Sequence, residues 1–305
     1  MAATIAIDVC IATFKRPLVL DKLLNSLHRQ NLDGISMRVV VVDNDHAQSA
    51  RAVVDAFRSR SRLDVVYDVE PEQNIALARN RTLRHLASDY FAFVDDDEMV
   101  SENWLRRLLD AMRQYQADIV FGPVISVLPA HSPSWADMNF QRPRRPSGQE
   151  VRTGGAGNVL IKRSILENEQ QVFDPSFGLT GGEDTDFFYR MHLAGRRLVW
   201  CDEAWAKEPV PDDRLSPEWL RRRGFRSGQN YARIFISRYA PYRLPLWFMT
   251  KSVQLLGAAV TLPLIRLYSY SHYVGLSVRM AAAFGQLSYC FSGKYYEEYR
   301  VRACS

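Results

Sequence analysis

Two clusters of carboxylates are the residues of this sequence best suited to chemistry. One follows an apolar run at residues 91–94 and the other follows two glycines further along the chain; they occupy residues 95–98 and 183–186. An ionised carboxylate beside an apolar run is unfavourable by several kcal/mol unless a cation neutralises it. A hard divalent cation such as Mg²⁺ or Mn²⁺ takes one or two carboxylates together with substrate phosphates. The first cluster therefore predicts a metal site or, in the simpler interpretation, a polar exit from a buried strand.

The spacing within the first cluster suggests which carboxylates act together. Side chains alternate between the two faces of an extended strand. Asp95 and Asp97 are therefore expected to face the same side and Asp96 the other. We therefore expect Asp95 and Asp97 to be the pair that holds the metal.

The second cluster is expected to open a helix. Asp184 could cap a helix that runs from Thr185 by accepting a backbone N–H, and this structural role is compatible with a chemical one. The positive end of the helix dipole favours an ionised carboxylate, which a general base must be. Gly181 and Gly182 permit close approach of a bulky substrate. Glu183 is suited to accepting hydrogen bonds from substrate hydroxyls.

The elements that must position these clusters alternate between strand and helix patterns. Strands are expected at residues 5–12, 38–43, 63–69 and 91–94, with helices from Pro17 and at 48–60 and 74–87 between them. This order predicts a mostly parallel sheet with right-handed crossovers. Ligands bind beyond the carboxyl ends of such strands. Thr13, Asp43, Glu70 and Asp95 would all lie on that rim.

Later elements follow with less regularity. We expect a helix at 101–115, a strand at 118–125, a strand at 158–162 and a helix from Asp184 to Leu193 that stops at Gly195. Residues 128–147 contain four prolines and three arginines and are expected to form a long loop.

Two rim positions allow either a chemical or a structural role. A carboxylate at Asp43, beside Asn44, could accept the N–H of a uracil-like ring or cap a turn. Arg79, one turn into the third helix, could hold Asp95 or a phosphate, or be a solvated helix charge.

Composition and charge bound the class of protein. A chain of 305 residues that is 47% hydrophobic and 24% charged is typical of a folded protein. A net charge of +5 is compatible with nucleic acid, anionic lipid or phosphorylated substrates and does not choose among them. The four cysteines show no C-x-x-C spacing, so neither a zinc site nor a redox pair is indicated. Free thiols and the absence of a signal-peptide pattern favour a cytoplasmic protein.

The C-terminal part differs in composition. Residues 244–265 are strongly apolar, but Lys251 and Arg266 bound a stretch shorter than the roughly 20 residues that a membrane span needs. Aromatic residues beside basic ones suit a segment in the membrane interface, and a helical layer packed on the catalytic part is the alternative. We expect a catalytic domain at 1–210 and a basic, apolar helical extension at 211–305.

The order of five motifs resembles glycosyltransferase family 2. They read Ile-Ala-Thr-Phe-Lys-Arg-Pro (11–17), Val-Val-Val-Val-Asp-Asn-Asp (39–45), Asn-Ile-Ala-Leu-Ala-Arg-Asn-Arg (74–81), Phe-Val-Asp-Asp-Asp-Glu (93–98) and Gly-Gly-Glu-Asp-Thr-Asp-Phe-Phe-Tyr-Arg (181–190). The segments 208–211 and 223–229 are similar to bacterial exopolysaccharide glucosyltransferases of the succinoglycan type. The resemblance implies an α/β GT-A nucleotide-diphospho-sugar transferase fold with a Rossmann-like, mostly parallel sheet.

The resemblance also implies roles for single residues. The residues that would bind the nucleotide are Thr13, Arg16, Asp43, Asn44, Arg79, Asp95 and Asp96. Asp97 and Asp95, in a DxD motif, would hold Mg²⁺ or Mn²⁺, which stabilises the leaving diphosphate. Asp184 would be the catalytic base and Glu183 an acceptor ligand. The family inverts the anomeric carbon and needs no enzyme nucleophile.

One position departs from the family pattern. Many GT-A enzymes supply a histidine near the end of the catalytic domain as a further metal ligand. Residues 204–208 contain none, and Lys207 could neutralise the diphosphate instead or be an ordinary surface lysine.

The function implied is transfer of a sugar, glucose from UDP-glucose, to a hydroxyl of a lipid-linked oligosaccharide in exopolysaccharide or cell-surface polysaccharide synthesis. The enzyme would lie peripherally on the inner face of the cell membrane, bound through its C-terminal region, and would not bind nucleic acid. A nucleotidyltransferase that makes the nucleotide-sugar is one alternative, although residues 13–17 lack the glycines of its phosphate loop. A sugar-binding GT-A protein without turnover is another, disfavoured by intact Asp95, Asp97 and Asp184.

Overall fold

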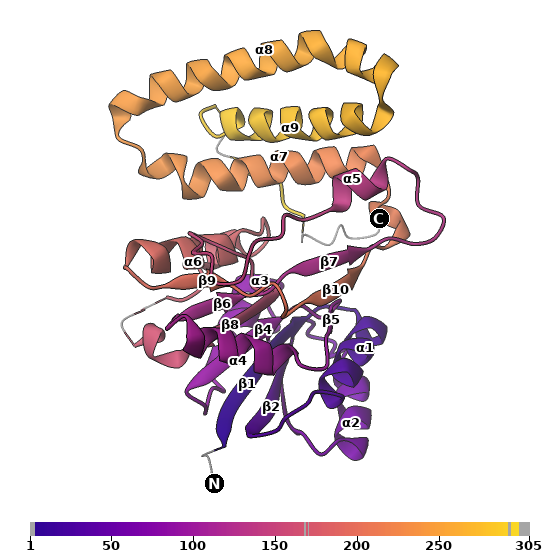
Figure 1. Ribbon diagram of the computed structural model, residues 1–305, viewed down its shortest axis with the longest axis vertical. Coiled ribbons are helices and arrows are strands. Elements are labelled where there is room, and N and C mark those ends of the chain that lie inside the picture. The colour runs from indigo at the N-terminus through magenta and orange to yellow at the C-terminus, as the bar shows by residue number, and fades with distance from the viewer. Residues whose placement is uncertain (1–3, 168, 170, 292–293, 299–305) are drawn as a thin grey trace.

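A seven-stranded sheet forms the centre of the molecule. The computed structural model describes residues 4–167, 169, 171–291 and 294–298. The sheet has the order β3-β2-β1-β4-β8-β6-β9 (Figure 1). Its strands are β1 Ile5–Thr13, β2 Ile35–Asp43, β3 Asp64–Val69, β4 Tyr90–Val94, β6 Ile119–Phe121, β8 Asn158–Lys162 and β9 Leu198–Trp200. All neighbours are parallel except that β8 is antiparallel to β4 and to β6. The mostly parallel sheet expected from the sequence is confirmed.

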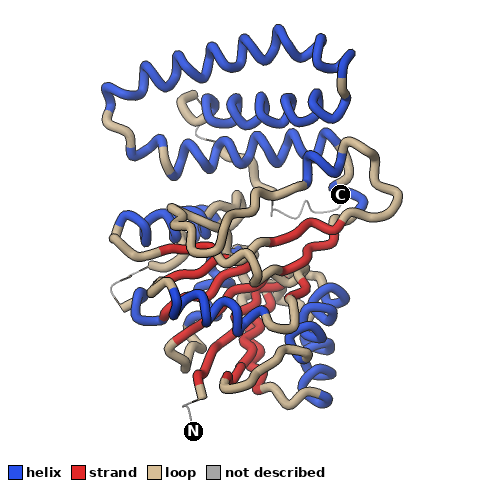
Figure 2. The backbone as a smooth tube through the Cα atoms, viewed as in Figure 1, coloured by secondary structure: helices blue, strands red, loops and turns tan. Residues whose placement is uncertain are grey.

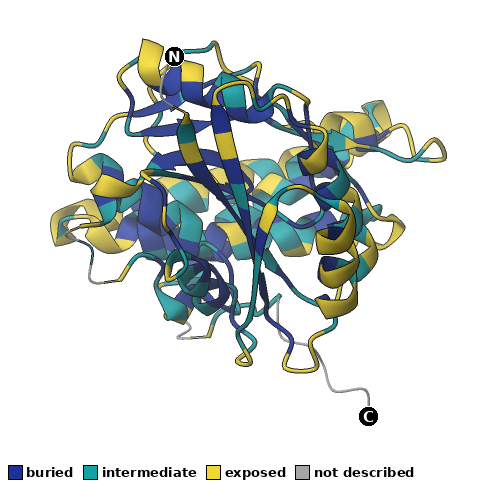
Figure 3. Cartoon of the chain, turned by 90° about the horizontal axis from the view of Figure 1, so that it is seen from below, coloured by how far each residue is buried: buried dark blue, intermediate teal, exposed yellow. Residues whose placement is uncertain are grey.

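Helices cover both faces of this sheet. On one face α1 (Pro17–His28), α2 (Arg51–Arg60) and α4 (Trp104–Gln114) share an apolar core with alternate residues of β1 and β2, such as Val39 and Val41. On the other, α3 (Ile75–Leu83) and α6 (Glu183–Leu193) pack with the intervening residues, such as Val40. A strand buried on both faces reads as a continuous apolar run, which explains the valines of β2. Figure 3 shows buried residues along the central strands and exposed residues on the outer helices.

A small second sheet extends the rim of the first. It contains β5 (Met99–Val100), β10 (Ala206–Pro209) and β7 (Val124–Val127) in the order β5-β10-β7. Strand β10 is antiparallel to β5 and parallel to β7. The sequence patterns predicted neither β5, β9 nor β10, because strands of two to four residues show no measurable periodicity.

Three local predictions were wrong. The strand expected at 118–125 is split into β6 and β7, which lie in different sheets. Proline cannot donate a ladder hydrogen bond, so the chain breaks at Gly122-Pro123, and a Cβ at Gly122 would lie 2.0 Å from the Ala204 carbonyl. The helix expected at 74–87 ends at Leu83, and the loop at 128–147 contains the short helix α5 (Ala136–Phe140).

Short 3₁₀ helices complete the connections. They are η1 Arg163–Leu166, η2 Pro175–Phe177, η3 Asp212–Arg214, η4 Ile236–Arg238 and η5 Pro241–Arg243. Figure 2 shows that loops fill much of the region between the sheet and the C-terminal helices.

Three long C-terminal helices stack beyond one end of the sheet. They are α7 (Pro217–Ile234), α8 (Leu244–Tyr268) and α9 (Tyr270–Ser288), with α9 between the other two (Figure 1). Glycines let α7 and α9 approach closely: a Cβ at Gly228 would lie 2.0 Å from the Ala282 carbonyl, and one at Gly285 would lie 2.0 Å from the Phe225 carbonyl. The outer helix α8 contacts α9 with one side and leaves the other uncovered.

Candidate active site

A large cavity opens at the carboxyl ends of β1 and β4, facing α7. Its volume is about 1360 Å³, and it is lined from the sheet side by residues such as Thr13 and Asp95 and from the helical side by residues such as Trp219 and Arg223. Sites for one drug-sized ligand are smaller, roughly 300–1,000 Å³. The cavity therefore has room for two substrates at once.

Arg79 joins the two carboxylate clusters across this cavity. It projects from α3, whose first turn is capped by the Asn74 side chain, an acceptor for the N–H of Leu77 at 3.1 Å. Arg79 Nη2 donates to Asp95 Oδ1 at 2.8 Å, and Nη1 contacts Glu183. The guanidinium is buried, and two carboxylates offset the unfavourable free energy of burying it.

Arg16 makes a second bridge, within the first cluster. Its Nη1 lies 2.9 Å from Asp97 Oδ2 and 3.3 Å from Asp96 Oδ1. Asp96 also accepts a hydrogen bond of 2.7 Å from Thr13 Oγ1. Burial raises the pKa of Asp96 to about 7, although Arg16 acts in the opposite direction.

The expected alternation of these three aspartates was wrong. Strand β4 ends at Val94, and the Glu98 N–H donates to the Asp95 carbonyl at 3.1 Å, so the cluster forms a turn. Asp96 and Asp97 therefore share Arg16, whereas Asp95 turns to Arg79. The two-residue period holds only in extended backbone.

The turn presents oxygen ligands that fit a divalent cation. Burial, followed by repulsion from Asp95, raises the pKa of Asp97, and burial raises that of Glu98 well above its usual value. Glu98 Oε2 has no hydrogen-bond partner among the described residues. A Cβ at Gly157 would lie 2.5 Å from Glu98 Oε1 and 2.9 Å from Asp95 Oδ2, so a larger residue there would displace these two carboxylates.

These carboxylates do not form a metal site by themselves. Across the described part of the chain, no group of three or more His, Cys, Asp or Glu side chains is placed to hold a metal ion. Magnesium and manganese are commonly held by one or two carboxylates plus substrate phosphates. The carboxylates of Asp95 and Asp97, both of which line the cavity, are as many as that arrangement needs.

Two residues at the end of β2 differ in their access to the cavity. Asn44 lines it, donating to the carbonyl of Glu70 at 2.9 Å and accepting from the N–H of Asn74 at 2.9 Å. Asp43 is fully buried and is not among the lining residues. Its carboxylate accepts hydrogen bonds from the N–H groups of residues 45 and 50 and from the Tyr67 hydroxyl, at 2.7–3.1 Å. These contacts are the turn-capping role that the sequence allowed.

The second cluster lies at the start of α6, but not in the arrangement expected. The helix begins at Glu183, and Gly182, with φ of +98°, occupies the N-cap position, which favours glycine. Asp184 is therefore inside the first turn rather than before it. Its Oδ1 accepts the Thr185 N–H at 2.6 Å, and its Oδ2 accepts the Ala156 N–H at 3.2 Å.

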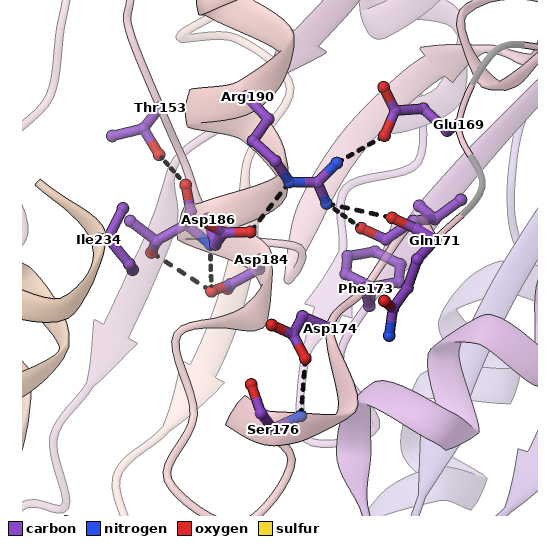
Figure 4. Close-up of polar contacts among 12 residues, drawn as sticks. Thr153, Glu169, Gln171, Phe173, Asp174, Ser176, Asp184, Asp186, Arg190 and Ile234 are labelled. Carbon is purple, nitrogen blue, oxygen red and sulfur yellow. Dashed lines mark hydrogen bonds and ion pairs between the residues drawn. The ribbon is translucent and has the colours of Figure 1, made fainter. Parts of the chain in front are cut away.

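The other two acidic residues of this cluster, Glu183 and Asp186, make different contacts. Glu183 is buried, and burial raises its pKa to about 7 despite Arg79. Asp186 instead accepts from Arg190 at 2.9 Å, and Arg190 also contacts Glu169 at 2.5 Å (Figure 4). Asp186 accepts a further hydrogen bond from Arg238 at 3.0 Å. Asp186 belongs to an ion-pair network that anchors α6.

Strand β10 places Glu208, and not Lys207, in the cavity. Ala206 and Glu208 are buried, whereas Lys207 between them is exposed and lies over the Trp205 ring at 5.0 Å. Glu208 lines the cavity and Lys207 does not, so of the two roles that the sequence allowed for Lys207 the structure agrees with that of an ordinary surface lysine. Strand alternation around Lys207 could have shown this, had β10 been recognised.

Glu208 forms ion pairs with two arginines that were not predicted to belong to the site. Arg214 Nη1 donates to Glu208 Oε1 at 2.9 Å, and Arg142 contacts Oε2. Arg214 also lies 3.8 Å from Asp97 Oδ2. A glycine segment was missed as well: Gly154, Gly155 and Gly157 line the cavity between the two acidic clusters.

Comparison with known proteins agrees with this geometry. The sequence profile described as Glycosyl transferase family 2 matches residues 8–169. Succinoglycan biosynthesis protein ExoM of Rhizobium meliloti (strain 1021) is 41% identical over 239 residues, which cover 77% of each chain. Validoxylamine A glucosyltransferase of Streptomyces hygroscopicus subsp. limoneus is 29% identical over 68% of this chain and 52% of its own length.

Solved structures share the fold. Mannosyltransferase PcManGT from Pyrobaculum calidifontis, in complex with GDP-Man and Mn²⁺, aligns with a TM-score of 0.67 and 16% identity over 94% of this chain and 88% of its own. S. aureus TarS 1-349 in complex with UDP-GlcNAc aligns with a TM-score of 0.55 and 16% identity over 96% and 93%. The sheet, the rim cavity and the profile together show that this chain has the GT-A fold and belongs to glycosyltransferase family 2.

Proposed function

We propose that this chain is an inverting, metal-dependent hexosyltransferase. It would transfer glucose from UDP-glucose to a hydroxyl of a lipid-linked oligosaccharide during exopolysaccharide or cell-surface polysaccharide synthesis. The contact of Arg79 with both Asp95 and Glu183 carries the proposal, because it brings the donor carboxylates and the acceptor carboxylates into one cavity. A relative named for succinoglycan biosynthesis and another named as a glucosyltransferase support the pathway class and the sugar.

Asp184 is the proposed general base. The acceptor hydroxyl gives its proton to the Asp184 carboxylate as its oxygen bonds to the anomeric carbon, and the bond from that carbon to the diphosphate breaks. Two backbone N–H groups already fix the carboxylate, at 2.6 and 3.2 Å, without using all of its lone pairs.

Glu183 and Arg79 are proposed to position the substrates. Glu183 accepts hydrogen bonds from acceptor hydroxyls, and its contact with Arg79 fixes its orientation. Arg79 in turn holds Asp95, so a displacement of the acceptor carboxylate would disturb the donor side as well.

The donor would bind along the sheet rim. Thr13, Arg16, Asn44 and Arg79 line the cavity there, together with Asp95 and Asp96. Asp95 and Asp97 would hold Mg²⁺ or Mn²⁺, which supplies positive charge to the departing diphosphate. For Asp43 to reach a nucleotide base, it would have to exchange one of its present protein donors.

The C-terminal region is proposed to hold the enzyme at the inner face of the cell membrane. Among the described residues, one helical stretch, Pro241–Tyr268, is long and apolar enough to cross a membrane by length and composition, and none of its apolar window is buried. We treat residues 1–210 as the catalytic domain and 211–305 as the extension. Residues of α7 line the cavity, so the extension would contribute to substrate binding as well as attachment.

A donor screen tests the proposed activity. The purified full chain is incubated with UDP-glucose, UDP-galactose, UDP-GlcNAc or GDP-mannose, with Mn²⁺, Mg²⁺ or EDTA and with membrane lipid extract as acceptor. With UDP-glucose and metal we expect release of UDP and formation of a glycolipid product. NMR of that product should show that the configuration at the anomeric carbon is inverted relative to the donor. No release from any donor would refute the transferase function, and a nucleoside triphosphate product formed with added pyrophosphate would support the nucleotidyltransferase.

A further inference from the structure

We propose that the α7 side of the cavity contains a second phosphate-binding subsite, in which Arg142, Arg214 and Arg223 bind the diphosphate of a lipid-linked acceptor. The inference rests on the proposed function and extends it by naming the group through which the acceptor is held.

The three arginines converge from separate segments. Arg142 lies in the loop after α5, Arg214 ends η3 and Arg223 lies on α7, and all three line the cavity. Arg142 and Arg214 share the carboxylate of Glu208, and Arg214 also lies 3.8 Å from Asp97 Oδ2, which gives two carboxylates for three guanidinium groups. Arg223 has no carboxylate within 4 Å among the residues that the structure describes. The cationic charge of the cluster therefore exceeds its anionic charge.

Trp219 fixes the arrangement. Its ring lies under the guanidinium of Arg214, 5.5 Å from the centroid, and under that of Arg223, at 5.3 Å. On α5, the Phe140 ring stacks with it at 6.1 Å and 11°. Stacking on an aromatic ring orients a guanidinium without consuming its N–H donors. Arg214 already donates to Glu208, whereas the donors of Arg223 remain available for a planar or tetrahedral anion.

The electrostatics of Arg223 agree with an anion site. Burial lowers the pKa of Arg223, and the like charge of Arg142 lowers it further. Several guanidinium groups this close are unfavourable unless an anion offsets their repulsion. A diphosphate, with two bridged phosphoryl groups, matches both the charge and the bidentate geometry that arginine prefers.

The position favours the acceptor over the donor as the source of the diphosphate. The donor diphosphate would lie at Asp95 and Asp97, whereas Arg223 lies on α7, the helix that packs on α9 and, through it, connects to α8. In a lipid-linked sugar the phosphates stand between sugar and lipid. They would therefore lie between the acidic clusters and the apolar outer helix. Arg214, 3.8 Å from Asp97, marks where the two regions meet.

The test compares R223Q with R222Q. Arg222 is the exposed neighbour on the same helix, so both variants remove one positive charge from α7 but only one removes it from the cavity. Inorganic pyrophosphate is titrated into full-length protein saturated with UDP and Mn²⁺, and tryptophan fluorescence is followed, with W219F to identify the Trp219 signal. We expect R223Q to bind pyrophosphate at least tenfold more weakly and R222Q to bind nearly as the wild type does, whereas R223K, which keeps the charge but not the bidentate, stacked guanidinium, should bind with an affinity between the two.

Kinetics identify the source of the anion. R223Q should raise KM at least tenfold for a diphosphate-linked acceptor and less than twofold for UDP-glucose, and it should not affect an acceptor analogue that lacks the diphosphate. R142Q, in a surface loop, should show the same pattern if R223Q folds poorly. Equal pyrophosphate binding by R223Q and R222Q, or a rise in KM confined to UDP-glucose, overturns the subsite. A wild-type chain that binds pyrophosphate but transfers no sugar would refute the proposed function and leave the binding result standing.

Discussion

Asp95 and Glu183 are held by the same guanidinium, that of Arg79. Asp95 directly follows β4 and Glu183 begins α6, so one side chain sets the spacing between the two carboxylate clusters. Glu183 is buried, whereas the Asp95 side chain is 44% exposed. The buried contact of Arg79 with Glu183 should therefore contribute more to the free energy of unfolding than its contact with Asp95, because water screens the more exposed Asp95 carboxylate.

Arg79→Gln should therefore destabilise the fold as well as abolish transfer. The substitution leaves the carboxylate of Glu183 buried without a cation, and we expect a loss of about 2–4 kcal/mol in the free energy of unfolding. Urea unfolding measures it. Arg84→Gln, at an exposed position after the same helix, is the matched control and should change stability by less than about 0.5 kcal/mol. Equal stability of the two variants would show that Arg79 does not support the cavity.

Asp184→Asn should abolish transfer while leaving UDP-glucose binding within about twofold. The amide keeps the size of the side chain but removes its ability to accept a proton, and loss of a general base typically lowers turnover by 10²–10⁴-fold. Turnover and calorimetric binding measure the two effects. Asp186→Asn, two residues later, removes contacts with Arg190 and Arg238 and should lower stability more than turnover. Unchanged turnover in D184N would remove Asp184 from the base role.

Asp97→Ala should remove the effect of metal on nucleotide binding. With Mn²⁺ present, we expect the variant to bind UDP at least tenfold more weakly than the wild type, and with EDTA the two should bind alike. Calorimetric titration under both conditions separates metal binding from direct contacts to UDP. Asp64→Ala, an exposed carboxylate on β3 away from the cavity, should behave as the wild type does. An identical response of D97A and wild type to Mn²⁺ would exclude the assignment.

The pH dependence of stability should report on Glu183. Burial raises its pKa from 4.5 to about 7 in the folded protein. Between these pH values the folded state binds more protons than the unfolded state, so this carboxyl contributes stability below about pH 4.5 that is lost as pH rises to about 7. Glu183→Gln stays neutral throughout. Its free energy of unfolding relative to wild type should rise across that window, by on the order of 3 kcal/mol.

Other buried acids do not obscure this result. Asp96 and Glu98 are present in both proteins, so their contributions cancel in the difference. Glu102→Gln, at an exposed position, is the control and should run parallel to the wild type. Parallel curves for E183Q and wild type from pH 4.5 to 8 would contradict the raised pKa.

The repeated β-α pattern made the sheet and the rim predictable. Apolar runs such as that of β2, and the helix after Pro17, have lengths and periods that local sequence determines. Their carboxyl ends must meet at one edge, which is why Thr13 and Asp95 could be placed together before any coordinates.

The contacts across the cavity could not be predicted in the same way. Arg142, Glu208 and Arg214 meet because a four-residue strand, β10, returns beside β5 and carries Glu208 inward. Such contacts depend on where short segments cross, and no local pattern encodes that. The face of Asp96 was mispredicted for a related reason: the position at which β4 ends, one residue before Asp95, changed which neighbours it contacts.

The outer side of α8 should bind lipid. Leu256, Val260 and Leu264 lie at helical spacing along it and are 66–74% exposed, although each is apolar. Burying such a side chain fully contributes roughly 1.5–3 kcal/mol, so three together could hold the enzyme on a bilayer. Nearby Lys251 and Arg266 would add about 1 kcal/mol each at an anionic surface. The triple variant L256Q/V260Q/L264Q should therefore sediment with anionic vesicles at least tenfold less than the wild type. Leu18→Gln, which replaces an 81% exposed leucine on α1, should sediment normally. If the wild-type chain stays in the supernatant with anionic and neutral vesicles alike, α8 does not bind the membrane.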